Sequence, residues 1–223
     1  MRMNKNQTNS RKYSGQTKEE RIAQRRKTFI EAGLQIIGTE GYRAATLRRL
    51  CKEAGLTERY YYESFSGSED VLIAVFEFCN SRIQSHVFSA ITQVGETADL
   101  AELMYRVLDS FFKEIEDPRV ARVAMLEFIG VSPKIDKLNE QFNNTIADLL
   151  LLLARNAHPS WEVSNEEGRL LGISLLGAVR QVAMSWFLSD YKLPREVVTK
   201  TSVKVSLGIN KQIEHELKQI KNS

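Results

Sequence analysis

Apolar residues recur at intervals of three and four along most of the chain, which is the period of an amphipathic α-helix. Strand-like alternation is not visible, and only 4 prolines and 12 glycines interrupt the 223 residues. The pattern therefore predicts an all-α fold. The prolines fall at the joints between apolar stretches, as expected for residues that begin helices or stand in connectors. In the C-terminal part the predicted helices run over residues 98–116, 118–130, 134–157, 163–190 and 194–220.

The N-terminal part divides into shorter helices with recognisable start and stop signals. Thr17 and Glu20 have the spacing of a capping box. Thr46 and Thr57 are placed to cap two further helices, and Gly55 between them can take the positive φ that ends the first of the two. The predicted helices run over residues 17–38, 47–54, 58–64 and 68–88.

Charge divides the chain in the same place. Residues 1–68 hold 14 Lys and Arg against 7 Asp and Glu, whereas residues 69–223 hold 17 against 21. A basic front end on a mildly acidic body is typical of a protein whose head binds a polyanion. We predict a flexible basic arm over 1–16, a DNA-binding domain over 17–67 and a helical body over 68–223.

Two short helices joined by a turn containing Gly55 match the plan of a helix-turn-helix, whose second helix enters the major groove with its N-terminal residues at the base edges. Arg59 near the start of that helix can donate two hydrogen bonds to guanine, and the Thr57 hydroxyl can cap the helix or contact a phosphate. Tyr60, Tyr61 and Tyr62 are consecutive, so one helix cannot bury all three on a single face. On the outer side of the preceding helix lie Arg48, Arg49 and Lys52, and of these Arg48 is predicted to bind DNA.

Order, spacing and residue type over residues 20–85 resemble the TetR-type family of one-component bacterial regulators. The resemblance is carried by Gly41-Tyr42, Thr46-Leu47, Leu50-Cys51, Ala54-Gly55-Leu56-Thr57, Tyr61-Tyr62, Phe65, Glu69-Asp70 and Leu72. It implies a three-helix DNA-binding head in front of a helical body that binds a ligand and dimerises. Carried over by position, phosphate contacts are expected at Thr46, Thr57 and Tyr62, and base contacts at Glu58, Arg59 and Tyr60.

The head departs from the family pattern at three positions. Arg59 stands where the family often has glycine, Ser64 where it often has histidine, and Ser68 where it often has lysine. The last two positions usually support phosphate contacts. The basic arm is expected to compensate, with Lys12, Lys18, Arg21 or Arg25 reaching phosphates or the minor groove. Each phosphate neutralised contributes roughly −0.9 to the log–log salt slope, so deleting residues 1–16 should flatten that slope.

The body has apolar helical stripes that could enclose an apolar or amphipathic ligand, although such stripes usually form the core. The residues predicted to line the pocket are Met104, Leu108, Phe111, Met125, Phe128, Phe142 and Ile146. Polar candidates within these stripes are Tyr105, Glu127, Asn143 and Arg180.

Small residues recur inside the apolar stretch 170–179, where glycine costs about 1 kcal/mol against alanine in a helix, so close approach of another helix is the sensible use. The family resemblance implies that the last two long helices, matched here by residues 170–188 and 197–220, form a four-helix dimer interface. The predicted interface residues are Gly172, Leu176, Gly177 and Arg180.

Other classes of protein find little support in the sequence. His86, His158 and His215 lie far apart, and no nucleophile triad, zinc motif or phosphate-binding glycine loop is present. We expect no enzyme activity, no cofactor and no metal. Cys51 and Cys79 fit two structural thiols in a reducing cytoplasm. No signal peptide is visible, and the most apolar run, residues 146–154, is too short to cross a bilayer.

The sequence therefore predicts a cytoplasmic, dimeric transcriptional regulator that binds an inverted-repeat operator in double-stranded DNA. Repression relieved by a small-molecule effector is the expected mechanism, because a ligand that favours wrongly spaced heads shifts the population off DNA. Control of the same DNA-binding head by a protein partner is the alternative.

Overall fold

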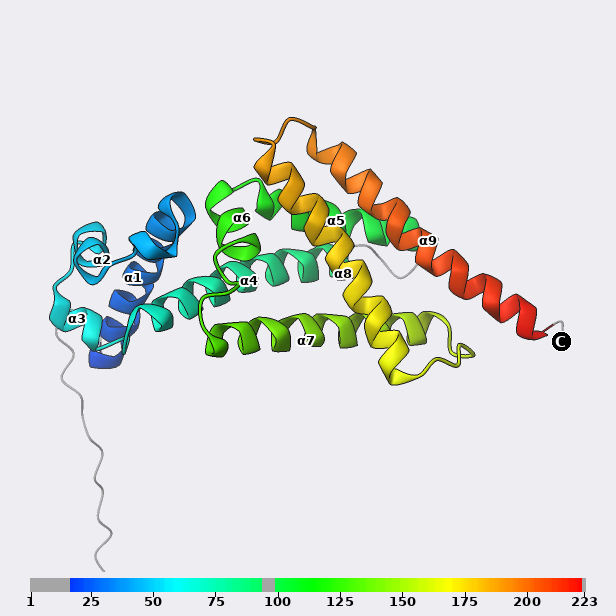
Figure 1. Ribbon diagram of the computed structural model, residues 1–223, viewed down its shortest axis with the longest axis horizontal. Helices are drawn as coiled ribbons and strands as arrows, with labels where there is room; N and C mark the ends of the chain where they lie inside the picture. Colours follow the sequence, from blue (N-terminus) through cyan, green and yellow to red (C-terminus); the bar gives the residue numbers. More distant parts are fainter. Residues whose placement is uncertain (1–16, 94–98, 222–223) are drawn as a thin grey trace, which may run out of the picture.

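The structure is a computed structural model that describes residues 17–93 and 99–221 of the chain. Every regular element in these two ranges is helical (Figure 1), which confirms the predicted all-α fold. The elements are α1 (Lys18–Glu40), η1 (Tyr42–Ala44), α2 (Leu47–Ala54), α3 (Glu58–Tyr62), α4 (Ser68–Gln93), α5 (Leu100–Ile115), α6 (Pro118–Met125), α7 (Pro133–Ala157), α8 (Asn165–Leu188) and α9 (Arg195–Lys221).

The helices begin where the sequence places their caps. The Thr17 hydroxyl accepts a hydrogen bond from the Glu20 backbone N–H at 3.1 Å, and the Glu20 carboxylate accepts one from the Thr17 backbone N–H at 2.6 Å. This reciprocal capping box satisfies two of the donors that the first turn of α1 leaves open. Gly55 ends α2 at φ 63°, in the left-handed region that glycine occupies without steric cost.

Several helix ends differ from the prediction by two residues or more, and α1 for example ends at Glu40 rather than 38. Helix α3 stops at Tyr62 rather than 64, and α4 continues past residue 88 to Gln93. Helix α6 stops at Met125 rather than 130, because the chain then turns through Gly130 at φ 70° to begin α7. This turn matters for the site, because it directs the Glu127 carboxylate toward the head.

Helix α1 packs on α4 and also on α2 and α3, and these helices form the head at the left of Figure 1 around one apolar cluster. Phe29, Leu50 and Tyr61 are buried at its centre. The same apolar cluster continues into the body, where Phe128 and Ile135 belong to it. Head and body therefore share one core. The domain boundary between residues 67 and 68 stays a prediction.

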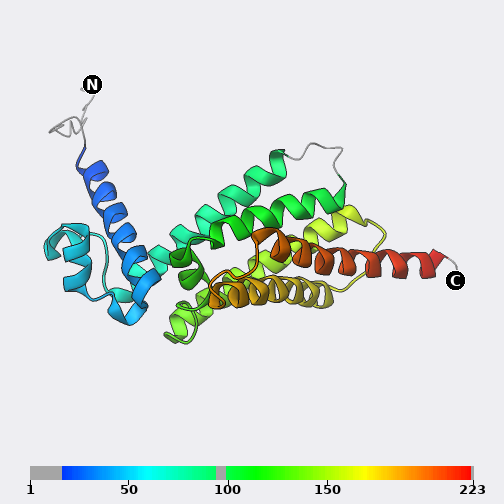
Figure 2. The ribbon, with the colours of Figure 1, turned by 90° about the horizontal axis from the view of Figure 1, so that it is seen from above.

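The body is made of long helices that pack in pairs (Figure 2): α4 along α5, α7 along α8, and α5 along α9. A second apolar cluster around Phe112 and Trp186 joins α5, α6, α8 and α9. A third, smaller cluster around Leu151 and Trp161 closes the far end.

Helix α8 buries one face and leaves apolar side chains on the other, where Leu170 and Leu188 are each 63 % exposed. By length and composition it could cross a membrane, although the core helix of a soluble protein passes the same test. The apolar run over residues 146–154 is too short to cross a bilayer, but α8 has a length and composition that would allow it.

Candidate DNA-binding surface and effector body

The turn between α2 and α3 is fixed from both sides. The Leu56 backbone N–H donates to the Cys51 carbonyl at 3.0 Å, which closes the end of α2 beyond Gly55. Tyr61 anchors α3, because its ring is only 3 % exposed and meets Phe29 edge-to-face with 5.6 Å between centroids. Burial raises the pKa of Tyr61 to about 12, so its hydroxyl stays neutral. One tyrosine thus fixes the angle at which the rest of α3 faces outward.

The residues at α3 that are predicted to contact DNA are exposed, with the exception of Tyr60. Thr57, Glu58 and Arg59 are exposed, and the Arg59 side chain keeps 85 % of its surface. The Thr57 hydroxyl makes no capping bond to α3 and faces solvent. Tyr62 is 63 % exposed, whereas Tyr60 is partly covered by the Arg25 guanidinium, which lies 4.2 Å from its ring centroid. Tyr60 can still present its edge to a base, but its face is occupied.

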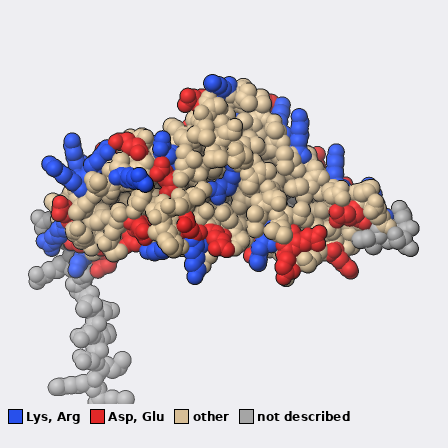
Figure 3. Space-filling view, viewed as in Figure 1, with Lys and Arg blue, Asp and Glu red and all other residues tan. Residues whose placement is uncertain are grey.

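The cations around the helix-turn-helix are not equally free. Arg48 and Lys52 are exposed and have no ion-pair partner among the described residues, which suits them to phosphates. Arg49 instead donates to both carboxylate oxygens of Glu40, and this bond lowers the pKa of Glu40. Thr46 is exposed, and its hydroxyl accepts from the Arg49 backbone N–H at 3.4 Å. Figure 3 shows Lys and Arg side chains projecting from the head end of the molecule.

Arg25 is not available for a phosphate as the sequence suggested. Its guanidinium is bound to the Glu63 carboxylate at 2.7 Å in addition to covering Tyr60. The basic arm over 1–16, including Lys12, lies outside the described residues. Lys18 and Arg21 at the start of α1 remain candidates for the backbone contacts expected of that region.

The two serines that depart from the family pattern behave differently. The Ser64 hydroxyl is buried and has no hydrogen-bond partner among the described residues, while its carbonyl accepts from Arg26 at 2.9 Å. Ser64 therefore does not present its side chain to DNA. Ser68 is exposed, and its hydroxyl lies 2.9 Å from the Tyr42 hydroxyl. Tyr42 was not predicted as a contact, although its pairing with Ser68 places two hydroxyls at the edge where lysine is common.

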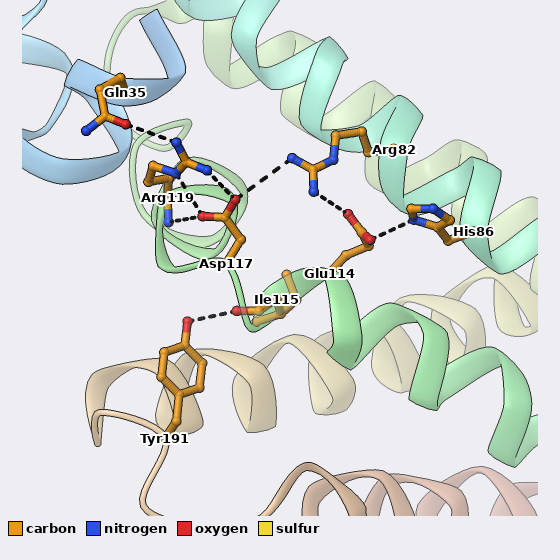
Figure 4. A network of polar contacts seen from close by, with 8 residues as sticks. All are labelled: Gln35, Arg82, His86, Glu114, Ile115, Asp117, Arg119 and Tyr191. Carbon is orange, nitrogen blue, oxygen red and sulfur yellow. Dashed lines mark hydrogen bonds and ion pairs between the residues drawn. The ribbon is translucent and has the colours of Figure 1, made fainter. Parts of the chain in front are cut away.

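A polar network joins the body to the head (Figure 4). Asp117 caps α6 and holds the Arg119 guanidinium at 2.8 Å, and Arg119 donates in turn to the Gln35 side chain of α1 at 2.9 Å. Burial raises the pKa of the Asp117 carboxyl, but the hydrogen bonds from Arg119 outweigh it, so the net pKa is lowered. Gly38 of α1 packs directly on Arg119, since a Cβ there would come within 2.6 Å of the Arg119 Cα.

Arg82 of α4 extends this network into the helical body. It binds the buried Glu114 carboxylate at 2.9 Å and approaches Asp117 at 3.9 Å. Glu114 also contacts His86 at 2.7 Å. The network thus links α1, α4, α5 and α6 at the joint between head and body (Figure 4).

A second bond crosses the same joint. The Glu127 carboxylate accepts from the Tyr42 backbone N–H at 2.8 Å and from Arg122 at 3.1 Å. Gly41, at φ 92°, leaves room for that carboxylate beside the head. Glu127 was considered from the sequence as a polar pocket residue, but the structure places it between α6 and the head, because α6 ends early.

The residues predicted to line a ligand pocket fall in two groups. Phe128 stacks on Phe76 with 3.6 Å between ring centroids, and Phe142 meets the edge of Phe76 at 5.6 Å. These rings belong to the core shared with the head. Leu108, Phe111 and Met125 belong to the second cluster. Of the predicted residues, those that keep partial exposure are Met104, Phe111, Phe142 and Ile146.

An open groove lies elsewhere, between the start of α5 and the first half of α9. It has a volume of about 440 Å³ and is lined in part by Glu102, Tyr105, Lys200 and Lys204. Tyr105 is the only predicted polar candidate on it. Its charged lining differs from the apolar pocket that the sequence suggested.

The four residues predicted for the dimer interface face different ways. Gly172 is buried inside the chain, where a Cβ would meet the Ala147 carbonyl oxygen of α7 at 2.7 Å. Arg180 also points inward, to Asn143 of α7 and to the Ala124 carbonyl of α6. Gly177 is exposed with no atom within 4 Å of an added Cβ, and Leu176 is partly exposed. Only the last two remain candidates for contact with a second subunit.

Comparison with known proteins agrees with this geometry. Residues 29–75 match the tetR family of bacterial regulatory proteins. The chain is 22 % identical over 166 residues, covering 74 % of its length, to the fatty acid metabolism regulator protein of Bacillus subtilis (strain 168), of which 84 % is covered.

Two solved structures share the fold. The fatty acid degradation regulator FadR of Bacillus halodurans aligns with a TM-score of 0.64 at 24 % identity, over 81 % of this chain and 93 % of that one. FadR of Bacillus subtilis in complex with stearoyl-CoA aligns with a TM-score of 0.64 at 18 % identity, over 80 % and 96 %.

The exposed helix-turn-helix on a helical body defines a DNA-binding transcriptional regulator. Residues 29–75 match the DNA-binding head of the tetR family of bacterial regulatory proteins, and the chain shares its overall fold with the two FadR structures.

Proposed function

We propose that the protein is a dimeric repressor that binds an inverted-repeat operator in the cytoplasm and is released by a long-chain acyl ligand. The observation that carries the DNA part is the exposed start of α3, where Thr57 and Arg59 project from a helix held by the buried Tyr61. Arg59 is exposed and its ion pair with Glu63 is long, at 3.8 Å, so its guanidinium can approach a base edge and supply sequence discrimination, while neighbouring hydroxyls and cations supply phosphate contacts.

The dimer part rests on the outward face of α8. Leu170, Ile173 and Leu188 are exposed there, and the open surface at Gly177 lies on the same face. On α9, Val197 and Val205 are exposed as well. Exposed apolar residues on two neighbouring long helices are typical of an interface, and pairing with the same helices of a second copy would form a four-helix contact. This use also accounts for the membrane-like composition of α8.

The effector part rests on partial exposure within the body and on the relatives. Met104, Phe111, Phe142 and Ile146 are only partly buried and keep accessible apolar surface. The Bacillus subtilis structure to which the chain is similar holds stearoyl-CoA. An acyl chain is the kind of ligand that such surfaces accept, since apolar pockets with a few polar groups bind amphipathic molecules.

Selection of bound DNA from a random pool tests the DNA role and the dimer together. We expect a palindrome with half-sites about one helical turn apart or a multiple of it. Arg59→Ala should relax the preference at one position of each half-site and cost about 1–3 kcal/mol of discrimination. Lys137→Ala, an exposed change on α7 outside the proposed DNA-binding and dimer surfaces, serves as the control. Recovery of unselected sequences would refute the proposal.

Gly177→Arg tests the interface. We expect sedimentation to show monomers and operator binding to be lost, because a charge would be buried in the apolar contact. Gly177→Ala is the matched control, since its methyl group meets nothing within 4 Å in the single chain. A dimer that survives the arginine excludes this face.

Thermal unfolding with stearoyl-CoA tests the effector. A ligand at 100 times its dissociation constant adds about 2.7 kcal/mol to the stability of the folded state. We expect stabilisation together with release of the operator in fluorescence anisotropy. If stearoyl-CoA has neither effect and protein partners alone stabilise the regulator, the acyl effector is refuted.

A further inference from the structure

Arg180 is an unusual cation of the body. It lies on α8, and its guanidinium donates to the Asn143 side-chain oxygen at 3.0 Å and to the Ala124 carbonyl at 3.3 Å. Both acceptors are neutral. Within the described ranges no carboxylate lies at ion-pair distance from Arg180, whereas Arg82, Arg119 and other arginines at helix junctions each bind one. Burial lowers the pKa of Arg180, because the charged form loses water without gaining an anion.

The surroundings of this guanidinium combine amide groups with apolar side chains. Ala124 lies in the apolar cluster that also contains Phe111, Met125 and Leu175. One helical turn before Asn143 on α7, the Asn139 side-chain oxygen is buried without a hydrogen-bond partner among the described residues. Keeping a desolvated cation without an acidic partner costs free energy, so we expect Arg180 to have a role beyond packing.

We propose that Arg180 binds the anionic end of an amphipathic effector whose apolar chain lies along α5, α6 and α7. This inference rests on the proposed acyl effector and names the group that recognises its polar end. The shared chemistry is an anion attached to an acyl chain, either the carboxylate of a free fatty acid or a phosphate of acyl-CoA. The bond from the guanidinium to the Ala124 carbonyl has a charge on one side only, whereas an anion brings the opposite charge and can accept two parallel N–H bonds, so an anion competes well with that carbonyl.

The same residue connects the effector to the head. The Ala124 carbonyl belongs to the last turn of α6, where Arg180 supplies a cation at the negative end of the helix dipole. The first turn of α6 holds Arg119 against Gln35 of α1. An anion that draws Arg180 away from Ala124 removes a support of the helix that contacts the head. By linkage, operator binding and anion binding then oppose each other by the same factor.

A purely structural role, as a cap for α6, predicts different results. The test measures affinities of the full chain for stearic acid, stearoyl-CoA and stearyl alcohol, each below its micelle concentration. The proteins compared are wild type, Arg180→Met and Arg180→Lys. Arg169→Met is the matched control, because Arg169 lies on the same helix in an exposed ion pair with Asp148.

We expect Arg180→Met to lose about tenfold to a hundredfold in affinity for at least one anionic probe, with little change for the alcohol. Arg180→Lys should keep part of the affinity, and Arg169→Met should match wild type. A loss confined to stearic acid identifies a carboxylate partner, and a loss confined to stearoyl-CoA identifies a phosphate partner.

Equal losses for the alcohol and the anions, or a lowered melting temperature with unchanged anion preference, would overturn the inference and leave the proposed effector standing. Failure of wild type to bind any of the three probes would instead overturn the proposed effector, and the role of Arg180 with it.

Discussion

Replacing Gly38 by alanine places a methyl group where the structure leaves no room for one. An added Cβ would lie 2.4 Å from the Arg119 Cβ and 2.6 Å from its Cα. Both atoms are at or next to the backbone of α6, so no side-chain rotation relieves the contact. Helix α1 and helix α6 must move apart for the alanine to fit.

The size of the effect follows from two opposing terms. Glycine in a helix costs about 1 kcal/mol against alanine, so the substitution gains at most that amount near the end of α1. Overpacking a buried contact costs about 1–3 kcal/mol, and a backbone obstacle lies at the upper end of that range. We expect a net loss of about 1–2 kcal/mol in the free energy of unfolding.

Urea unfolding at neutral pH measures this difference, with Gly208→Ala as the control. Gly208 is an exposed residue of α9, and an added Cβ there meets nothing within 4 Å, so alanine should stabilise by up to about 1 kcal/mol. A Gly38→Ala protein as stable as wild type, beside a stabilised control, would refute the close contact between α1 and α6.

Three further predictions concern the joint and the core. Glu127→Ala should cost about 1.5–3 kcal/mol in urea unfolding, because the Tyr42 backbone N–H loses a charged acceptor at 2.8 Å; recovery of much of this stability by Glu127→Gln would support that reason. The lowered pKa of Asp117 stabilises the fold above the ordinary carboxyl pKa, and this contribution disappears as the pH falls through the lowered value. Asp117→Asn should therefore be less stable than wild type by about 1–2 kcal/mol at pH 7, and the gap should close in acid; a gap that persists would contradict the assignment. Burial raises the pKa of Cys79 to about 12, so a thiol reagent at pH 8 should modify it only as fast as the protein unfolds.

The head was largely predictable because its signals are local. The capping box at Thr17, the Thr46 cap and Gly55 fix the start of α1 and both ends of α2, and each depends on residues within one helical turn. The spacing of these signals also gave the family resemblance. Which residues of the head are buried was harder to predict. Three consecutive tyrosines show that one must face outward, but only the packing of Tyr61 against Phe29 shows that Tyr61 is the buried one.

The charged residues of the head show the limit of local reasoning. Arg48 and Arg49 are adjacent and look equivalent in the sequence, yet Arg49 is bound to Glu40 at the end of α1 while Arg48 is free of ion pairs in the described structure. Arg25 is likewise bound to Glu63, which lies far along the chain. Ion pairs between elements depend on how helices pack, so composition alone cannot assign a cation to DNA.

In the body, the sequence determined that the elements are helices and that small residues recur in α8, because both follow from periodicity and helix propensity. Only the tertiary structure decided how those residues are used. Gly172 meets the backbone of α7, whereas Gly177, on the same helix, faces open space. Arg180 and Glu127 look like ordinary polar residues in the sequence, but in the structure each forms hydrogen bonds between elements that are distant in the chain. Such roles arise from the crossing of helices distant in the chain, and no short stretch of sequence encodes that crossing.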